Sequence, residues 1–121
     1  MRPEIFLVDH EAMLLELNTV LLEPLGYRVQ AFLDPVAAVR AFLLADPRPA
    51  LLITDYAMEG MNGLEVISAC RRVSPAQKII LLSGSIDEIT SQSAAAKPDR
   101  FLSKPYLCQE LTDLVRAVLA E

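Results

Sequence analysis

Four residues with side chains suited to phosphate or metal chemistry stand directly after short apolar runs. The runs cover residues 5–8, 51–54, 78–82 and 100–103, and the residues that follow them are, in order, Asp9, Asp55, Ser83 and Lys104. Ligands of an open parallel sheet bind outside the carboxyl ends of its strands, so we expect these side chains to converge. Carboxylate and hydroxyl oxygens suit Mg²⁺, and a lysine pairs with phosphate oxygens. The chemistry indicated is phosphoryl transfer.

The elements that must position these side chains follow an alternating pattern. Short apolar runs alternate five times with helix-length segments, which is typical of βα units around a parallel sheet. The strands are expected at 5–8, 27–32, 51–54, 78–82 and 100–103. Five helices are expected. The first follows Glu11 and ends at Gly26, and the second begins after an Asp34-Pro35 cap. The third covers 63–73, the fourth is a short segment at 87–96, and the last begins at Leu107.

Apolar spacing also predicts which side of each helix faces the core. The residues expected to face it are Leu14, Leu17, Leu21 and Leu25 in the first helix, Val36, Val39 and Leu43 in the second, and Leu107, Leu111, Leu114 and Val118 in the last.

Composition limits the classes of function. The chain has 121 residues, 53% of them hydrophobic, and we expect one domain over 1–121. Its net charge of −5 argues against direct binding of nucleic acid, and its apolar runs are too short for a membrane span. With no signal-peptide pattern, a cytoplasmic location is expected. Cys70 and Cys108 lack metal or redox spacing and are predicted to be reduced, buried thiols.

Four motifs in this order resemble those of response-regulator receiver domains. Val8-Asp9-His10-Glu11 is similar to the family's acidic pair, and the segment from Asp55 through Met58 to Gly63 resembles its acceptor-aspartate loop. Leu82-Ser83-Gly84 resembles the hydroxyl-bearing turn, and Lys104-Pro105-Tyr106 resembles the lysine-proline-aromatic signature. The resemblance runs from Ile5 to Leu119. It implies a flavodoxin-like, doubly wound (βα)5 fold whose parallel sheet has the strand order 2-1-3-4-5.

The resemblance also assigns roles to residues. Asp55 would be the phosphate acceptor, and Mg²⁺ would be held by Asp9, Asp55 and the backbone carbonyl of Ala57. Ser83 would bind a phosphoryl oxygen, and Lys104 would pair with Asp55 before phosphorylation and with the phosphate afterwards. Phe101 would be the switch aromatic, coupling the site to the face formed by segment 87–96, the fifth strand and the last helix. The implied partners are a histidine kinase or phosphotransfer protein and a downstream effector, with a homodimer as a further option.

Two residues depart from the family pattern. His10 replaces the second acid of the metal-binding pair, and imidazole is a poor partner for Mg²⁺. We therefore expect weak Mg²⁺ binding, with Mn²⁺ as an alternative ion. Glu59 replaces the proline that is usual in the loop after the acceptor and adds a charge near the site.

Other classes of phosphate-binding protein require residues that this sequence lacks. An aspartyl-phosphate phosphatase needs an acid two residues after its nucleophile, where this chain has Ala57, so a turnover enzyme is not expected. A flavin-binding protein would need a phosphate-cradling loop where Asp9-His10-Glu11 stands, and a P-loop is absent from the sequence. The alternative that stays open is a degenerate receiver that binds a protein partner without taking phosphate.

Overall fold

A five-stranded parallel sheet forms the centre of the computed structural model, which describes residues 2–84 and 97–121. The strand order is β2-β1-β3-β4-β5, as the sequence predicted. The strands are β1 (Glu4–Val8), β2 (Arg28–Phe32), β3 (Leu51–Asp55), β4 (Ile79–Ser83) and β5 (Arg100–Ser103). Their boundaries differ from the expected ones by one residue at most, and Asp55 and Ser83 are the last residues of their strands rather than the first of a loop.

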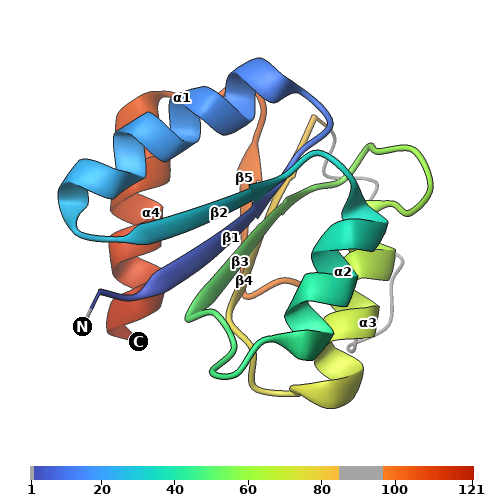
Figure 1. Ribbon diagram of the computed structural model, residues 1–121. Coiled ribbons are helices and arrows are strands. Elements are labelled where there is room, and N and C mark those ends of the chain that lie inside the picture. The colour runs from blue at the N-terminus through green and yellow to red at the C-terminus, as the bar shows by residue number, and fades with distance from the viewer. Residues whose placement is uncertain (1, 85–96) are drawn as a thin grey trace.

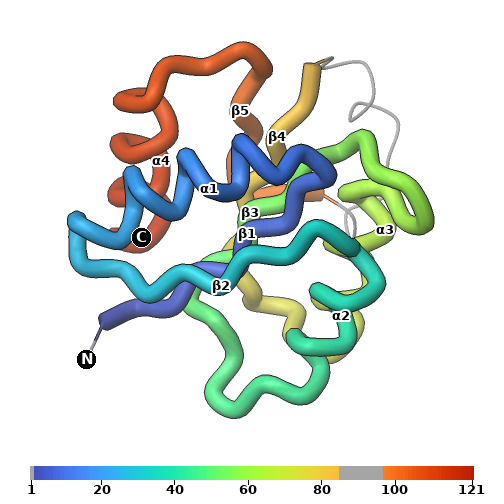
Figure 2. The backbone as a smooth tube through the Cα atoms, turned by 45° about the horizontal axis from the view of Figure 1, so that its top comes forward, coloured from blue at the N-terminus to red at the C-terminus, as the bar shows by residue number. Residues whose placement is uncertain are grey.

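The helices lie on both faces of this sheet. Figure 1 shows α1 (Ala12–Leu22) and α4 (Cys108–Ala120) on one face, and α2 (Pro35–Leu44) and α3 (Gly63–Val73) on the other. The tube in Figure 2 shows the same two pairs from above, on either side of the strands. The helix predicted at 87–96 lies outside the described residues. Within 2–84 and 97–121, no helix is long and apolar enough to cross a membrane.

Both faces of the central strands are buried. β3 and β4 are buried along their whole length, as expected for strands covered by helices on either side. Side chains alternate between the two faces, so that Ile5 and Leu7 pack towards α1 and α4, while Phe6 and Val8 pack towards α2 and α3. The two resulting cores hold the sheet rigid up to the strand ends.

The predicted core-facing sides of two helices are wrong. In α1 the buried residues are Leu15, Asn18 and Leu22, whereas Leu17 is 46% exposed. In α2 the buried residues are Pro35, Ala38 and Phe42, whereas Val36 and Leu43 are exposed. Val39, which was also predicted to face the core, is partly buried and does pack against it. Both helices carry apolar residues on most of their circumference, so spacing alone could not select the side that meets the sheet. The prediction for the last helix, α4, is more accurate, because Leu111 and Val118 are buried as expected. Leu107, by contrast, is exposed.

Local signals set several helix ends. The Asp34 side chain accepts a hydrogen bond from the backbone N–H of Val36 (3.1 Å), which confirms the predicted cap. Asn62 and Glu65 cap α3 reciprocally at 2.9 Å each. After α1 a 3₁₀ turn runs over Glu23–Leu25 and ends at Gly26, whose φ of 102° favours glycine.

The two cysteines differ in environment. Both are free thiols, as predicted, and Cys70 is buried on the core-facing side of α3. Cys108 is exposed, which corrects the expectation that both are buried. It is the first residue of α4, on the turn entering the helix rather than on its core-facing side. Burial raises the pKa of the Cys70 thiol to about 12, so Cys108 is the more reactive of the two.

Gly63 is predicted to be essential for the close approach of α3 to β3. A Cβ at this position would lie 2.4 Å from the backbone oxygen of Asp55 and 2.8 Å from Leu81 Cδ1. Gly63→Ala should therefore lower the free energy of unfolding by at least about 2 kcal/mol in urea denaturation. Gly84→Ala is the matched control, because no described atom lies within 4 Å of its Cβ position. Equal stability of the two variants would contradict the packing argument.

Candidate functional site

The strand order brings the four predicted site residues to one edge of the sheet. Backbone hydrogen bonds extend the pairing past the strand ends, from Asp9 N to Phe32 O (3.1 Å) and from Lys104 N to Ser83 O (2.8 Å). β1 and β3 are neighbours, as are β4 and β5, so residues 21 to 95 positions apart in sequence meet here. The direction of each side chain is thus set by the register of the sheet.

One ammonium group joins the two buried carboxylates. Lys104 Nζ lies 3.0 Å from Asp55 Oδ1 and 3.4 Å from Asp9 Oδ2. Asp9 and Asp55 are each 2% exposed, and Lys104 is half-buried. Two carboxylates taken out of water at such close range repel each other, and the shared cation offsets that repulsion.

The pKa values record this balance. The pKa of the Asp9 carboxyl is raised overall, mainly because the group is buried and also because the Asp55 charge lies nearby. The backbone N–H of Glu11 and the Lys104 ammonium act in the opposite direction and lower this pKa, but they do not cancel the effect of burial. Burial lowers the pKa of Lys104, but its hydrogen bond to Asp55 and the charge of Asp9 outweigh burial and raise it overall. Lys104 is therefore a permanent cation in this site.

His10 makes a contact that the sequence did not predict. Its ring Nδ1 lies 2.9 Å from Asp55 Oδ2 and donates a hydrogen bond to it, and it lies 3.6 Å from Asp9 Oδ1. Its side chain is 49% exposed, so the ring covers the carboxylates from the solvent side. Both oxygens of Asp55 are thus engaged, one by Lys104 and the other by His10. No local signal could have indicated this contact, because it joins residues 45 positions apart.

Part of the predicted metal-binding set fits a divalent cation. Asp9, His10 and Asp55 offer ligand atoms that all lie within 4.8 Å of one another. The two carboxylates are hard oxygen donors that suit Mg²⁺, whereas the imidazole nitrogen suits softer ions. Ala57 lies exposed in the loop after β3, and the part of its carbonyl in metal binding stays a prediction.

Ser83 and Phe101 lie on the two strands beyond β3. Ser83 is fully buried at the end of β4, one residue after Leu82, which is the register partner of Asp55 on the neighbouring strand. Phe101 is half-buried on β5, opposite Leu81, and packs against the core shared by α2 and α3. A shift at the end of β5 would be felt by this ring, but its role as a switch stays a prediction.

The arrangement can bind a cation and a phosphoryl group side by side. It combines two buried carboxylates, a lysine ammonium and a hydroxyl at the carboxyl edge of a doubly wound sheet. An ammonium and a hydroxyl can bind phosphate oxygens, and a carboxylate can act as a nucleophile towards phosphorus once one of the two partners of Asp55 is displaced. They define a class of α/β protein in which strand-end carboxylates and a lysine handle phosphate.

Comparison with known proteins gives the family. The family model described as "Response regulator receiver domain" matches residues 5–116, and the chain belongs to this family. The DNA-binding response regulator MtrA of Mycobacterium tuberculosis is 31% identical over 121 residues, covering 98% of this chain and 51% of that protein. Response regulator MprA of Mycobacterium ulcerans is 32% identical over 96 residues, covering 78% of this chain and 40% of that protein. The chain thus spans about half the length of the curated relatives that it matches.

Solved structures agree with this assignment. The response regulator TrrA from Thermotoga maritima, in complex with Mg(2+)-BeF, superposes with a TM-score of 0.86 at 29% identity, covering 98% of this chain and 99% of that one. The signal receiver domain of an HD domain-containing protein from Pseudomonas fluorescens gives a TM-score of 0.88 at 29% identity, covering 99% and 96%. The receiver fold expected from the sequence motifs is confirmed.

Asp9→Asn is predicted to stabilise the metal-free protein. A carboxyl whose pKa is raised by folding contributes stability below its unfolded pKa, and that stability is lost as pH rises through the folded pKa. At neutral pH the ionised Asp9 therefore costs stability, and the neutral amide should raise the thermal midpoint by a few degrees. The gain should shrink as the pH falls through the raised pKa of folded Asp9, and it should be gone below about 4, where the carboxyl is protonated in the unfolded chain as well.

The matched control for this measurement is Asp113→Asn. Asp113 is an exposed acid on α4 whose side chain is 57% accessible, and its removal should leave the midpoint almost unchanged. A lower midpoint for Asp9→Asn at neutral pH would mean that the Lys104 ion pair outweighs burial.

Proposed function

We propose that this chain is a phosphoacceptor switch in which Asp55 takes a phosphoryl group from a phosphohistidine. The donor would be a histidine kinase or a phosphotransfer protein. The observation that carries the proposal is the 3.0 Å contact between Lys104 Nζ and Asp55 Oδ1 at a buried edge that also holds Asp9 and Ser83. A lysine held against a carboxylate can pass to the phosphoryl oxygens once they arrive.

The transfer step balances on this chain's own groups. An Asp55 carboxylate oxygen forms a P–O bond while the P–N bond to the donor imidazole breaks, and the imidazole nitrogen takes up a proton. Lys104 then pairs with the phosphoryl group, and Ser83 donates its hydroxyl hydrogen to a phosphoryl oxygen. Before attack, Asp55 must release one of its two partners, which makes the strength of the His10 contact part of the mechanism.

A divalent cation fits this proposal. Asp9 and Asp55 would hold it, with the Ala57 carbonyl as the third protein ligand. When bound, Mg²⁺ neutralises charge on the phosphoryl oxygens. The Mg(2+)-BeF complex of TrrA, a relative at 29% identity, supports this cofactor. Because His10 supplies nitrogen rather than oxygen, we propose that Mg²⁺ binds weakly and that Mn²⁺ can replace it.

The proposed output passes through β5. Phosphorylation would draw Lys104 towards the phosphate and shift the strand that carries Phe101, changing the face of β5 and α4 for a downstream effector or a second copy of the chain. The relatives named MtrA are DNA-binding proteins, whereas this chain is acidic, so any DNA contact is proposed to belong to a partner or to sequence beyond it. The free thiols of Cys70 and Cys108 suit a reducing compartment, and we place this exchange in the cytoplasm.

We propose a switch rather than a turnover enzyme, because Ala57 stands where a phosphatase would carry its general acid. The second candidate function is a degenerate receiver that binds a partner without phosphate. The His10 hydrogen bond to Asp55 Oδ2 favours it, since that contact occupies a carboxylate oxygen that metal or phosphate would need. The retained Lys104, Ser83 and Asp55 favour phosphorylation.

Phosphorylation is tested with a small phosphodonor. The wild-type chain, incubated with acetyl phosphate and either Mg²⁺ or Mn²⁺, should gain the mass of one phosphoryl group. Asp55→Asn should gain none and keep its fold, because the amide preserves shape but is not a nucleophile. Asp113→Asn, which removes an exposed carboxylate on α4, should be labelled as well as the wild type. A folded wild type that takes no phosphate with either metal would support the degenerate receiver.

His10→Asp should raise Mg²⁺ affinity, on the order of tenfold. The change adds an oxygen ligand and also frees Asp55 Oδ2 from the imidazole. Calorimetric titration of both proteins with Mg²⁺ and Mn²⁺ at one pH gives the comparison, and His10→Ala separates the release of Asp55 from the added ligand. Equal Mg²⁺ affinity in the wild type and His10→Asp would place residue 10 outside the metal shell.

A further inference from the structure

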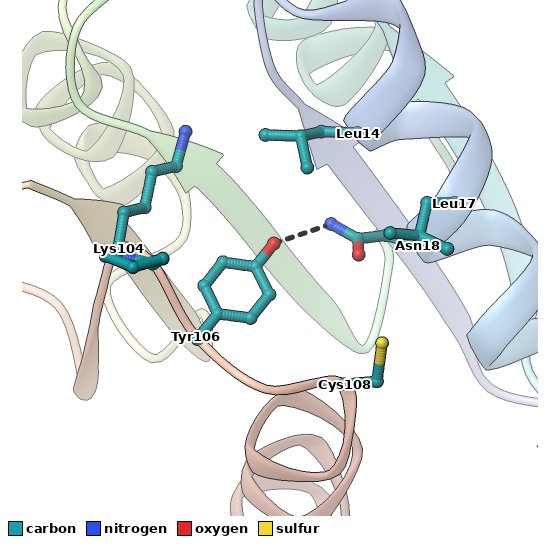
Figure 3. A pocket seen from close by; sticks show the side chains of 7 residues that line it. Leu14, Leu17, Asn18, Lys104, Tyr106 and Cys108 are labelled. Atoms are coloured by element: carbon teal, nitrogen blue, oxygen red, sulfur yellow. Dashed lines mark hydrogen bonds between the residues drawn. The ribbon is translucent and has the colours of Figure 1, made fainter.

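A cavity of about 330 Å³ lies between α1 and the segment that joins β5 to α4. It is separate from the carboxylates of Asp9 and Asp55, which are not among its lining residues. The residues that Figure 3 labels around it are Leu14, Leu17, Asn18, Lys104, Tyr106 and Cys108. Leu17 and Cys108 are exposed, so the cavity can be reached from solvent.

The lining of the cavity includes one buried polar side chain, Asn18, whose hydrogen-bonding capacity is only partly used. Asn18 is 3% exposed, and its Nδ2 donates a hydrogen bond to the Tyr106 hydroxyl oxygen at 3.0 Å. Its Oδ1 is buried and has no hydrogen-bond partner within the described part of the chain. Figure 3 shows the amide extending from α1 towards Tyr106 and Cys108. An unpaired buried acceptor destabilises the protein, and a ligand that donates a hydrogen bond to it would remove that cost.

The remaining lining makes the site neutral and largely apolar. Leu14 and Leu17 supply aliphatic surface, and the Tyr106 ring forms one wall. The ammonium of Lys104 points away to Asp55 and Asp9, at 3.0 and 3.4 Å, so only its hydrocarbon stem is available to the cavity. Burial raises the pKa of Tyr106, which keeps its hydroxyl neutral. A hydroxyl that accepts from Asn18 can still donate its own hydrogen.

We propose that this cavity binds a small neutral molecule that combines an apolar body with an N–H or O–H donor, such as a primary amide or an alcohol. The donor pairs with Asn18 Oδ1, and the apolar part lies against Leu14 and Leu17. A ligand bound here also contacts the hydrocarbon stem of Lys104, so its binding affects the side chain whose ammonium pairs with Asp55. The binding site goes beyond the proposed function and does not depend on phosphorylation.

Reactivity of Cys108 gives a direct readout of occupancy. Cys108 lines the cavity and is exposed, whereas Cys70 is buried and serves as an internal control in the same chain. Benzamide is the probe, and acetophenone, which carries a methyl group in place of the amide NH₂, is its matched control. For a probe of this size we expect a Kd of about a millimolar. At ten times the Kd, mass action should slow modification of Cys108 by a maleimide about tenfold.

Two variants locate the effect. Asn18→Leu removes the acceptor and should abolish the preference for benzamide over acetophenone. Leu17→Trp fills the cavity from a position that is already 46% exposed, so it should fold and lose protection by either compound. All of these measurements use the unphosphorylated, metal-free protein, so their outcome is independent of whether Asp55 accepts phosphate.

Three results would overturn the proposal. One is that benzamide leaves the Cys108 rate unchanged at millimolar concentration. Another is that acetophenone protects Cys108 as well as benzamide does, which would mean that Asn18 takes no part. The last is that only a phosphodonor protein protects Cys108, which would make the cavity part of a protein interface.

Discussion

The ion pair between Lys104 and the two buried carboxylates is the interaction on which the rest of the site depends. Asp9 and Asp55 are almost fully removed from water, and two like charges in that position are costly without a counter-ion. Lys104, the residue directly after β5, reaches both carboxylates. Lys104 thereby offsets the repulsion between the two carboxylates in the folded chain. Under the proposed function, the same ammonium would then pair with the phosphoryl group.

This ion pair requires a rigid frame. β1 and β3 are held between two cores, and the pairing of Lys104 N with Ser83 O keeps the end of β5 beside β4. Gly63 lets α3 begin directly against the backbone of Asp55, so the position of Asp55 depends on the packing of this helix. The two carboxylates therefore lie together with Lys104 at the carboxyl edge of the sheet.

His10 and Asn18 show how side chains outside the motifs modify this frame. His10 occupies the second oxygen of Asp55, so binding of a metal or a phosphoryl group must compete with a hydrogen bond that a carboxylate at this position would not make. Asn18 lies on the buried side of α1, and only half of its amide is paired. Each is accommodated within the receiver fold, and the proposals for metal and ligand binding depend on these two side chains.

The sequence by itself determined the order and type of the elements, because runs of apolar residues and helix caps are local signals. The βα alternation, the Asp34 cap and α3 at Gly63–Val73 could all be read from neighbouring residues. The motif order also identified the family and the strand-end residues. The side of α1 that meets the sheet was decided only in the tertiary structure, since that helix is apolar on most of its surface. The contacts of His10 with Asp55 and of Asn18 with Tyr106 join residues 45 and 88 positions apart, and distances of that kind depend on strand register and helix packing, which no local pattern encodes.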